Sequence, residues 1–175
     1  MTRITGACVC LVALSIVVQA DESASAEKVQ KLAQQIGDAT LRGEYAKVID
    51  ATFDGVIREM GGREKAIQLI ADGMRTLKGK GITFKKYQIG KPGDFHREGD
   101  NTFVVVPTVL EMSLPGNKLI AKSYLLGISA DNGKSWKFAD GAGMQNKALR
   151  DKVLPKLPPK LQLPAKEQPK VVPEK

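Results

Sequence analysis

The stretch Ser123–Gly141 (SYLLGISADNGKSWKFADG) constrains the fold of this chain most, because it predicts two neighbouring antiparallel strands. An apolar run leads into turn-forming residues, and the pattern then alternates around Trp136 and Phe138. Asn132-Gly133 is the dipeptide that tight hairpins favour, because both residues tolerate a positive φ. We therefore expect a sheet built on this hairpin, with the upstream segments covering one of its faces.

The turn of this hairpin also matches the Asp-box pattern S-x-D-x-G-x-[ST]-W, from Ser129 to Trp136. Sialidase-type propellers repeat that pattern over several blades of about 40 residues, whereas this chain holds one copy. The pattern thus predicts turn chemistry and not a glycosidase. Asp131 is expected to accept hydrogen bonds from backbone amides of its own turn, with Gly133 at a positive φ and Trp136 packed back on the strand.

Residues 1–20 match a secretory signal peptide. Arg3 supplies a positive charge, an apolar core of about a dozen residues follows, and Val18-Gln19-Ala20 is a small-residue cleavage site. A second cleavage site at Ala24-Ser25-Ala26 leaves the start of the mature chain open. The apolar core is too short to span a bilayer comfortably. We expect an exported protein, periplasmic or extracellular, whose mature form has no transmembrane segment.

Cys8 and Cys10 are the only cysteines, and both lie inside the predicted signal peptide. The mature domain is therefore expected to fold without disulfides, on a core that about 125 residues can supply. A lipoprotein is the alternative, but it would carry its cysteine at the end of the apolar run. Here both cysteines lie near the beginning of that run.

The net charge of +8 is concentrated in the C-terminal segment. Residues 147–175 hold eight Lys/Arg and three Asp/Glu, and Arg3 lies in the signal peptide, so residues 21–146 carry only +2. A domain with so little excess charge does not present the basic face that nucleic-acid binding requires. We expect no nucleic-acid partner.

Hydrophobic periodicity predicts helices first and strands afterwards. Helical spacing covers residues 26–42, 44–53 and 63–78, and Val56–Met60 is a short strand candidate. Strands are predicted at residues 82–89, 102–113, 118–129 and 134–139, and a last helical turn at 147–154. Alternation in the first of these strands places Phe84 and Tyr87 on opposite faces. Pro107 lies inside the second strand and indicates an edge position or a bulge, because proline cannot donate to the ladder.

These elements predict an α+β domain over residues 26–146, with three N-terminal helices packed on a curved antiparallel sheet of four to five strands. Their order resembles that of the nuclear transport factor two-like superfamily, which includes ketosteroid isomerase, scytalone dehydratase and polyketide cyclases. The Gly43-Glu44-Tyr45 corner, the Gly61-Gly62-Arg63-Glu64 start of a helix and the Trp136 strand carry the resemblance. The chain is also similar to small exported bacterial members without an assigned activity, through its EMGGREK and GKSWKFADG segments and its Pro/Lys ending.

The resemblance implies a cone-shaped domain, in which the sheet wraps around a helix and leaves a pocket at the open end. Enzymes of the superfamily place acid–base residues there, usually an Asp or a His with a Tyr or a second acid. In this chain the candidates for lining such a pocket are Asp50, Glu111, Tyr124 and Trp136. A buried Glu111 beside the Tyr124 hydroxyl would have a perturbed pKa that suits proton transfer.

The candidates also have purely structural interpretations. Asp50 would be a helix-surface carboxylate, and Glu111 would pair with Lys118 or Lys122 across the strands. His96, the only imidazole, lies in a predicted charged loop and is expected to be a surface histidine. No cysteine–histidine cluster has metal-ligand spacing, and no P-loop, GxGxxG or GxSxG motif occurs. Catalytic residues therefore stay unassigned, and no metal or cofactor is expected.

The tail, residues 147–175, is basic and proline-rich. From Pro155 onward it holds six of the nine prolines, interleaved with lysines. Such a segment is expected to be polyproline-like or disordered, and to enter neither a helix nor a sheet. Two roles are open for it: a solvated end without a partner, or an extended basic chain that contacts anionic envelope polymers or lipid headgroups.

The sequence therefore favours an exported small-ligand- or protein-binding module, with a small apolar ligand in the pocket. A non-enzymatic role is favoured because the full isomerase or dehydratase pattern is missing. One alternative is a lyase or isomerase that uses acid–base chemistry in the pocket. The other is an envelope interaction protein that forms a homodimer through the outer face of the sheet.

Overall fold

The computed structural model describes residues 13–173, with side chains described from Ala24 onward. It is an α+β structure with an antiparallel sheet, as the sequence predicted. Four helices come first: α1 (Ala13–Arg42), α2 (Tyr45–Asp50), α3 (Asp54–Glu59) and α4 (Arg63–Gly79). The strands are β1 (Thr83–Ile89), β2 (His96–Glu98), β3 (Asn101–Leu114), β4 (Asn117–Ser129), β5 (Lys137–Asp140) and β6 (Lys170–Pro173), with η1 (Gly143–Gln145) and α5 (Lys147–Val153) before β6.

The helix count differs from the prediction, because four helices and not three precede the sheet. The additional one is α3, which lies where the strand candidate Val56–Met60 was predicted. A run this short does not separate a strand from a helix by its periodicity. Val56 in α3 and Met60, the residue that caps it, are four residues apart and lie on one side of the helix. Both line the cavity described below, so tertiary packing decides the conformation.

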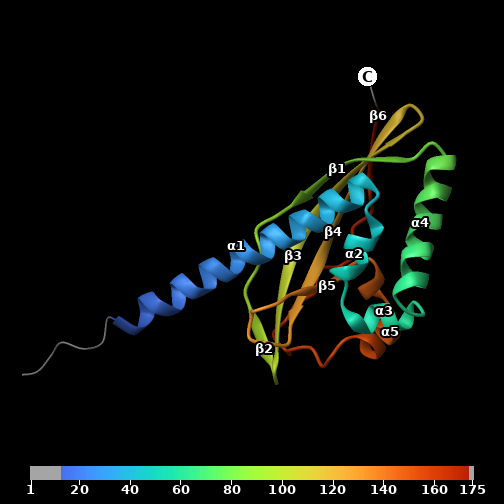
Figure 1. Ribbon diagram of the computed structural model, residues 1–175. Helices are drawn as coiled ribbons and strands as arrows, with labels where there is room; N and C mark the ends of the chain where they lie inside the picture. The colour runs from blue at the N-terminus through green and yellow to red at the C-terminus, as the bar shows by residue number, and fades with distance from the viewer. Residues whose placement is uncertain (1–12, 174–175) are drawn as a thin grey trace, which may run out of the picture.

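Two strands were also not predicted, which raises the strand number from four or five to six. The main path of the sheet is β1-β3-β4-β5, and β3 and β4 pair along their whole length from Thr102↔Ser129 to Leu114↔Asn117. The additional strands extend it at its margins: β2 pairs with β3 beyond the end of β1, and β6 pairs with β4 near the hairpin tip. Figure 1 shows this long hairpin with α1 crossing one face of the sheet.

Pro107 lies in a central strand, but the ladder with β1 ends at Thr108 and the ladder with β2 covers only residues 101–103. At Pro107 one side of β3 is therefore a local edge, and no bulge lies there. In an antiparallel ladder the N–H and C=O of one residue point toward the same neighbour. The Pro107 carbonyl accepts from the Gly90 N–H at 2.8 Å, just where β1 ends. The missing donor therefore points toward the gap between β1 and β2, where it breaks no regular pair.

The two faces of the sheet bury separate apolar clusters. The helical face, which α1 covers, is formed by Val104, Val106, Leu125 and Phe138 and packs with Trp136 and the α1 residues Val29, Ala33 and Ile36. The outer face is formed by Phe103, Tyr124, Leu126 and Ile128 and packs with α5 and the first part of the tail. A strand buried on both faces explains the near-continuous apolar runs in β3 and β4.

The loop between β4 and β5 confirms the predicted turn chemistry. Asn132 and Gly133 have φ values of 57° and 84°. The Asp131 carboxylate accepts from the Ser135 backbone N–H at 2.8 Å and from the Ser135 hydroxyl at 2.6 Å. These bonds, together with one from Ser129, lower the pKa of Asp131 to about 2. Trp136 is buried, and its Nε1–H donates to the Gly133 carbonyl at 3.2 Å.

The tail follows the outer face instead of leaving the domain. Leu157, Leu161 and Leu163 pack against the outer-face cluster. The Lys156 ammonium lies 2.6 Å from a Glu98 carboxylate oxygen. The expectation that the tail would not enter a sheet is wrong for Lys170–Pro173, which forms β6 on β4. The three leucines supply packing that the proline and lysine content alone did not indicate.

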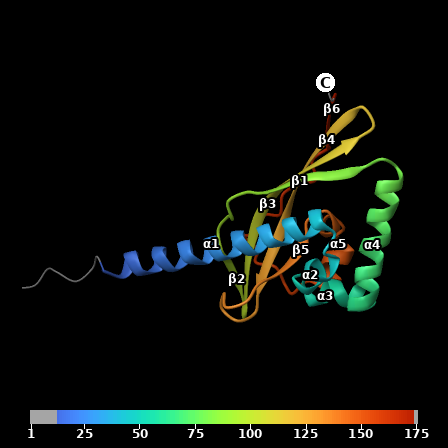
Figure 2. The ribbon, with the colours of Figure 1, turned by 45° about the horizontal axis from the view of Figure 1, so that its top comes forward.

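Helix α1 projects beyond the sheet at its N-terminal end (Figure 2), and from Ala24 onward its first buried residue is Val29. Of the predicted signal peptide, residues 1–12 lie outside the described residues, and 13–20 form the first turns of α1. Between residues 13 and 173, no helix combines the length and apolarity needed to cross a membrane.

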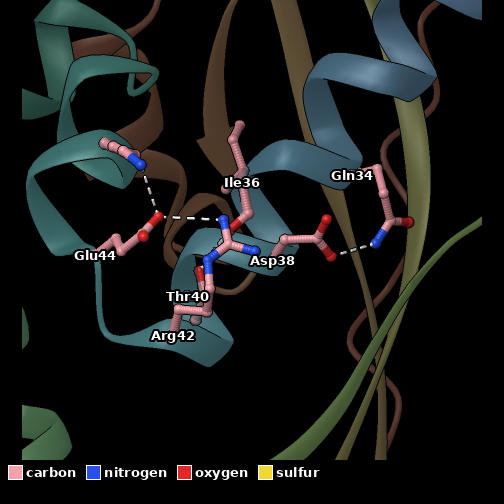
Figure 3. Close-up of polar contacts among 7 residues, drawn as sticks. Gln34, Ile36, Asp38, Thr40, Arg42 and Glu44 are labelled. Atoms are coloured by element: carbon pink, nitrogen blue, oxygen red, sulfur yellow. Dashed lines mark hydrogen bonds and ion pairs between the residues drawn. The ribbon is translucent and has the colours of Figure 1, made fainter.

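The corner between α1 and α2 lies at Gly43, which has a φ of 72°. Figure 3 shows the ion pairs that flank it: the Arg42 guanidinium and the Lys47 ammonium lie 3.1 and 3.0 Å from one Glu44 oxygen. The positive φ turns the chain sharply, because glycine adopts it without steric cost. The corner thereby places Tyr45 of α2 and Thr40 of α1 in the wall of one cavity.

Candidate functional site

A cavity of about 500 Å³ lies between the four N-terminal helices and the helical face of the sheet. Its helical walls are mainly apolar and include Ile36, Val48, Ile49, Val56, Met60, Ile70 and Met74. Its floor comes from β1, β3, β4 and β5 and includes Phe84, Tyr87, Thr108, Leu110, Ala121, Ser123, Leu125, Phe138 and Asp140. All four strands of the main sheet path and all four helices therefore contribute to one cavity, which is partly open to solvent.

Helix α4 supplies the outermost wall. Ile70 and Met74 lie four residues apart, so they project from the same side of the helix into the cavity. Among the described residues of α4, only Ala66 is fully buried. An amphipathic helix normally buries its apolar stripe against a packed core. The stripe of α4 instead faces a space of ligand size, which explains its partial exposure.

Two of the polar residues in the helical walls, Thr40 and Thr52, already donate to backbone carbonyls four residues earlier. The Thr40 hydroxyl donates to the Ile36 carbonyl at 2.8 Å (Figure 3). The Thr52 hydroxyl donates to the Val48 carbonyl, also at 2.8 Å. These two hydroxyl protons are therefore used, and the Tyr45 phenol is the remaining polar group of the helical walls.

The sheet side carries a polar row that crosses four adjacent strands, formed by Tyr87, Thr108, Ser123 and Asp140. Thr108 and Ser123 are direct partners in the β3–β4 ladder. Asp140 is paired with Leu125, two residues along β4 from Ser123. Diagonal neighbours at this spacing lie within reach of polar side chains. The row thus places four polar side chains on the sheet wall of a mainly apolar cavity.

Asp140 is the charged member of the polar row. It is the last residue of β5, and its Oδ1 accepts from the Ala142 N–H at 2.8 Å. The side chain is exposed to solvent, and the surrounding protein removes part of its hydration. This desolvation raises the pKa of the Asp140 carboxyl, and the backbone N–H groups of Ala142 and Gly143 offset it in part. A carboxyl in such surroundings can act as a base or bind a donor group.

Tyr87 lies at the other end of the polar row, on β1. Burial raises the pKa of its phenol to about 12, the negative charge of Asp140 adds to the rise, and a hydrogen bond with Thr108 opposes it. The phenol is therefore neutral over the physiological range and offers one donor and one acceptor. Tyr87 and Asp140 thus line the same cavity, one at each end of the polar row.

Asp50 and Trp136 lie outside this cavity, in a separate open hollow of about 610 Å³ between α1, α2 and the β5 loop. The Asp50 carboxylate forms a two-pronged ion pair with Arg63, with contacts of 2.7 and 3.0 Å. This pair lowers the pKa of Asp50. The structural interpretation, a helix-surface carboxylate, describes Asp50 better than a role in proton transfer.

Glu111 lies on the outer face, away from the cavity. Its carboxylate is 2.7 Å from the Lys118 ammonium. Lys118 lowers the pKa of Glu111, as does Lys86 across the strand. The cross-strand pairing with Lys118 predicted as an alternative is therefore present. Glu111 is paired with Ile120, four residues from Tyr124, or about 13 Å along the strand, so the two are not in contact.

Tyr124 is buried on the outer face, within the cluster that α5 and the tail cover. Its hydroxyl is the one buried side-chain polar atom without a hydrogen-bond partner among the described residues. Burial raises the pKa of this phenol. An unsatisfied hydroxyl in an apolar cluster costs free energy and performs no chemistry in the cavity.

Tyr124→Phe is therefore expected to raise the free energy of unfolding by about 1 kcal/mol, because it removes an unsatisfied polar group and keeps the ring. Thermal unfolding followed by circular dichroism measures this change. A clear loss of stability would show that the hydroxyl has a partner. Ligand binding in the cavity is expected to be unchanged.

The residues that sequence inspection missed are Asp140 and Tyr87. Asp140 follows Phe138 by two positions, so both side chains lie on the same face of the strand. The alternation predicted for residues 134–139 already indicates this face.

His96, which lies in β2 and not in a loop, does not line the cavity. Within residues 13–173, no cluster of three His, Cys, Asp or Glu side chains is arranged to hold a metal ion.

The cavity can hold an apolar molecule of modest size and contact it with one carboxyl and several hydroxyls. Pockets of 300–1,000 Å³ with apolar walls and a few convergent polar groups are typical small-molecule sites. Comparisons with protein-family models, with curated proteins and with solved structures give no match.

Proposed function

We propose that this protein binds a small apolar ligand in the cavity between α1–α4 and the helical face. The observation that carries the proposal is the cavity itself. It has a volume of about 500 Å³, mainly apolar walls and a row of four polar residues on the sheet side. A cavity without a ligand leaves apolar side chains in contact with water, which costs about 25 cal/mol per Å². A ligand that fills it recovers that free energy.

The proposal includes the export expected from the signal peptide and the resemblance to the nuclear transport factor two-like superfamily. Two features support the resemblance: helices precede an antiparallel sheet, and a cavity lies between the two layers. Fold alone does not determine activity, so the assignment of a ligand site depends on the lining residues.

Filling the cavity is expected to abolish binding. Ala121 lies on β4 and lines the cavity, so Ala121→Phe places an aromatic ring where the ligand would lie. We expect the affinity for N-phenyl-1-naphthylamine, a neutral fluorescent apolar probe, to decrease by about 10-fold or more. Fluorescence titration measures it. The neighbouring Lys122→Phe adds the same ring on the outer face and is expected to bind like the wild type.

Equal affinity of the wild type and the Ala121→Phe variant would place the probe elsewhere. If the wild type does not bind the probe at all, the cavity is not an apolar-ligand site. Both variants are to be compared at temperatures where circular dichroism shows them folded, so that a loss of binding is not a loss of structure.

A second candidate function is acid–base catalysis of the lyase or isomerase type. It is favoured by one observation, the Asp140 carboxyl with its raised pKa in the same cavity as the Tyr87 phenol. Asp140 would accept a proton from the substrate, and Tyr87 would donate a hydrogen bond to a developing negative charge. Asp50, Glu111 and Tyr124, the residues considered for this role from the sequence, do not line this cavity.

A further inference from the structure

The polar wall of the cavity indicates which apolar ligand fits best. Of the residues that line the cavity, Asp140 is the only one with a charged side chain. Its described hydrogen bonds come from the backbone, and no ion pair of Asp140 occurs within residues 13–173. The cavity therefore presents one negative charge without a positive partner.

Three other carboxylates with a changed pKa differ in that respect. Glu111 is paired with Lys118 at 2.7 Å, and Asp50 with Arg63 at 2.7 Å. Asp131 is satisfied by hydroxyl and amide donors of its own turn. Asp140 is exposed to solvent and lines the cavity, but no cation among the described residues is paired with it. A ligand that carries a cation would supply this partner.

We propose, on the basis of the ligand cavity proposed above, that the preferred ligand is an apolar molecule carrying a protonated amine. The ammonium group would lie against the Asp140 carboxylate, where it forms a charge-assisted hydrogen bond. The oxygen atoms of Ser123 and Tyr87, in the same polar row, can accept its remaining N–H donors. The apolar part would fill the space toward Ile70 and Met74.

The same arrangement disfavours anionic ligands. A carboxylate head group at the polar row would lie near the like charge of Asp140, and no Lys or Arg lines the cavity to compensate it. A neutral alcohol would keep the apolar contacts but would lose the charge-assisted bond. Amine, alcohol and carboxylate are therefore expected to bind in decreasing order of affinity.

A series of probes with one ring and three head groups tests this order. 2-Naphthylmethylamine, 2-naphthylmethanol and 2-naphthoate are titrated at pH 7.5 against the purified protein, in competition with N-phenyl-1-naphthylamine. We expect the amine to bind about 10-fold tighter than the alcohol, and the naphthoate more weakly than either. Asp140→Asn is expected to remove the preference for the amine and to keep the affinity for the alcohol within about 3-fold.

Asp50→Asn is the matched control, because it neutralises a carboxylate that lies outside this cavity, and it is expected to keep the amine preference. An alcohol or a naphthoate that binds as tightly as the amine overturns the inference but leaves the ligand cavity in place. An Asp140→Asn variant that still prefers the amine also overturns the inference and leaves the ligand cavity in place. If none of the three compounds nor the dye binds to the wild type, both the proposed function and the inference fail. The wild-type series decides the question even if Asp140→Asn does not fold.

Discussion

Gly55→Ala is expected to destabilise the protein by about 3 kcal/mol, since it overpacks a close contact between two helices. A β-carbon at Gly55 of α3 would lie 1.9 Å from the Val153 carbonyl oxygen of α5 and 3.0 Å from the Phe53 ring. The obstructing atom belongs to the backbone, so a side-chain rotation cannot relieve the contact. Thermal unfolding followed by circular dichroism is expected to show a midpoint lower by roughly 6–12 °C.

Gly73→Ala provides the matched control. Gly73 lies inside α4, and no atom lies within 4 Å of a β-carbon built on it. Alanine forms helix better than glycine, so this variant is expected to gain up to about 1 kcal/mol. An unchanged midpoint for Gly55→Ala would show that α5 does not pack on α3, and that the Lys152–Glu59 ion pair between them is absent.

The contact between α3 and α5 also determines the path of the tail. Val153 and Leu154 are buried on the outer face, and Leu157, Leu161 and Leu163 continue that packing. The tail thus covers part of the surface through which a homodimer was considered from the sequence. A dimer through the outer face would have to displace this segment or form beside it.

The long strands could be predicted from the sequence because their signal is local. Thr83–Ile89, Asn101–Leu114 and Asn117–Ser129 lie within one residue of the predicted bounds. Pleated alternation and the Asn132-Gly133 turn depend on neighbouring residues only. The short strand β6 was missed for the opposite reason: Lys170–Pro173 pairs with residues about 50 positions earlier in the chain.

Tyr87 was missed because a bulge changes which face of the sheet part of β1 presents. The register shifts between Phe84 and Lys86, so Lys85 is an extra residue. Strict alternation placed Phe84 and Tyr87 on opposite faces, but with the bulge both lie on the cavity side. A bulge depends on the partner strand and leaves no local pattern. Tyr87 could therefore not be assigned to the cavity from the sequence alone.

The four predicted site residues have side chains suited to a ligand site, but the sequence does not indicate where in the fold they lie. Glu111 and Tyr124 lie on β3 and β4, the two strands that also supply Thr108 and Ser123 to the cavity, but on the outer face. A shift by one residue along a strand changes the face. Whether Glu111 and Tyr124 face the cavity or the outer side depends only on this one-residue shift. The residue types are the same in both cases, so the sequence does not decide between the two faces.

Trp136→Ala is expected to cost about 4 kcal/mol, the range typical for removing a buried tryptophan. Trp136 is 6% exposed and packs with Phe95 at a ring-centroid distance of 5.7 Å. It also fixes the turn, because its Nε1–H donates to the Gly133 carbonyl. Trp136 is the only tryptophan, so unfolding of the variant is followed by circular dichroism and not by intrinsic fluorescence.

Trp136→Phe separates the structural role of this residue from a ligand role. The smaller ring keeps most apolar contacts and loses the indole donor, so about half of the destabilisation of Trp136→Ala is expected. Trp136 does not line the cavity that holds Asp140, so the folded Phe variant is expected to bind N-phenyl-1-naphthylamine like the wild type. Loss of binding in a stable Trp136→Phe protein would instead place the ligand in the hollow shared by Trp136 and Asp50.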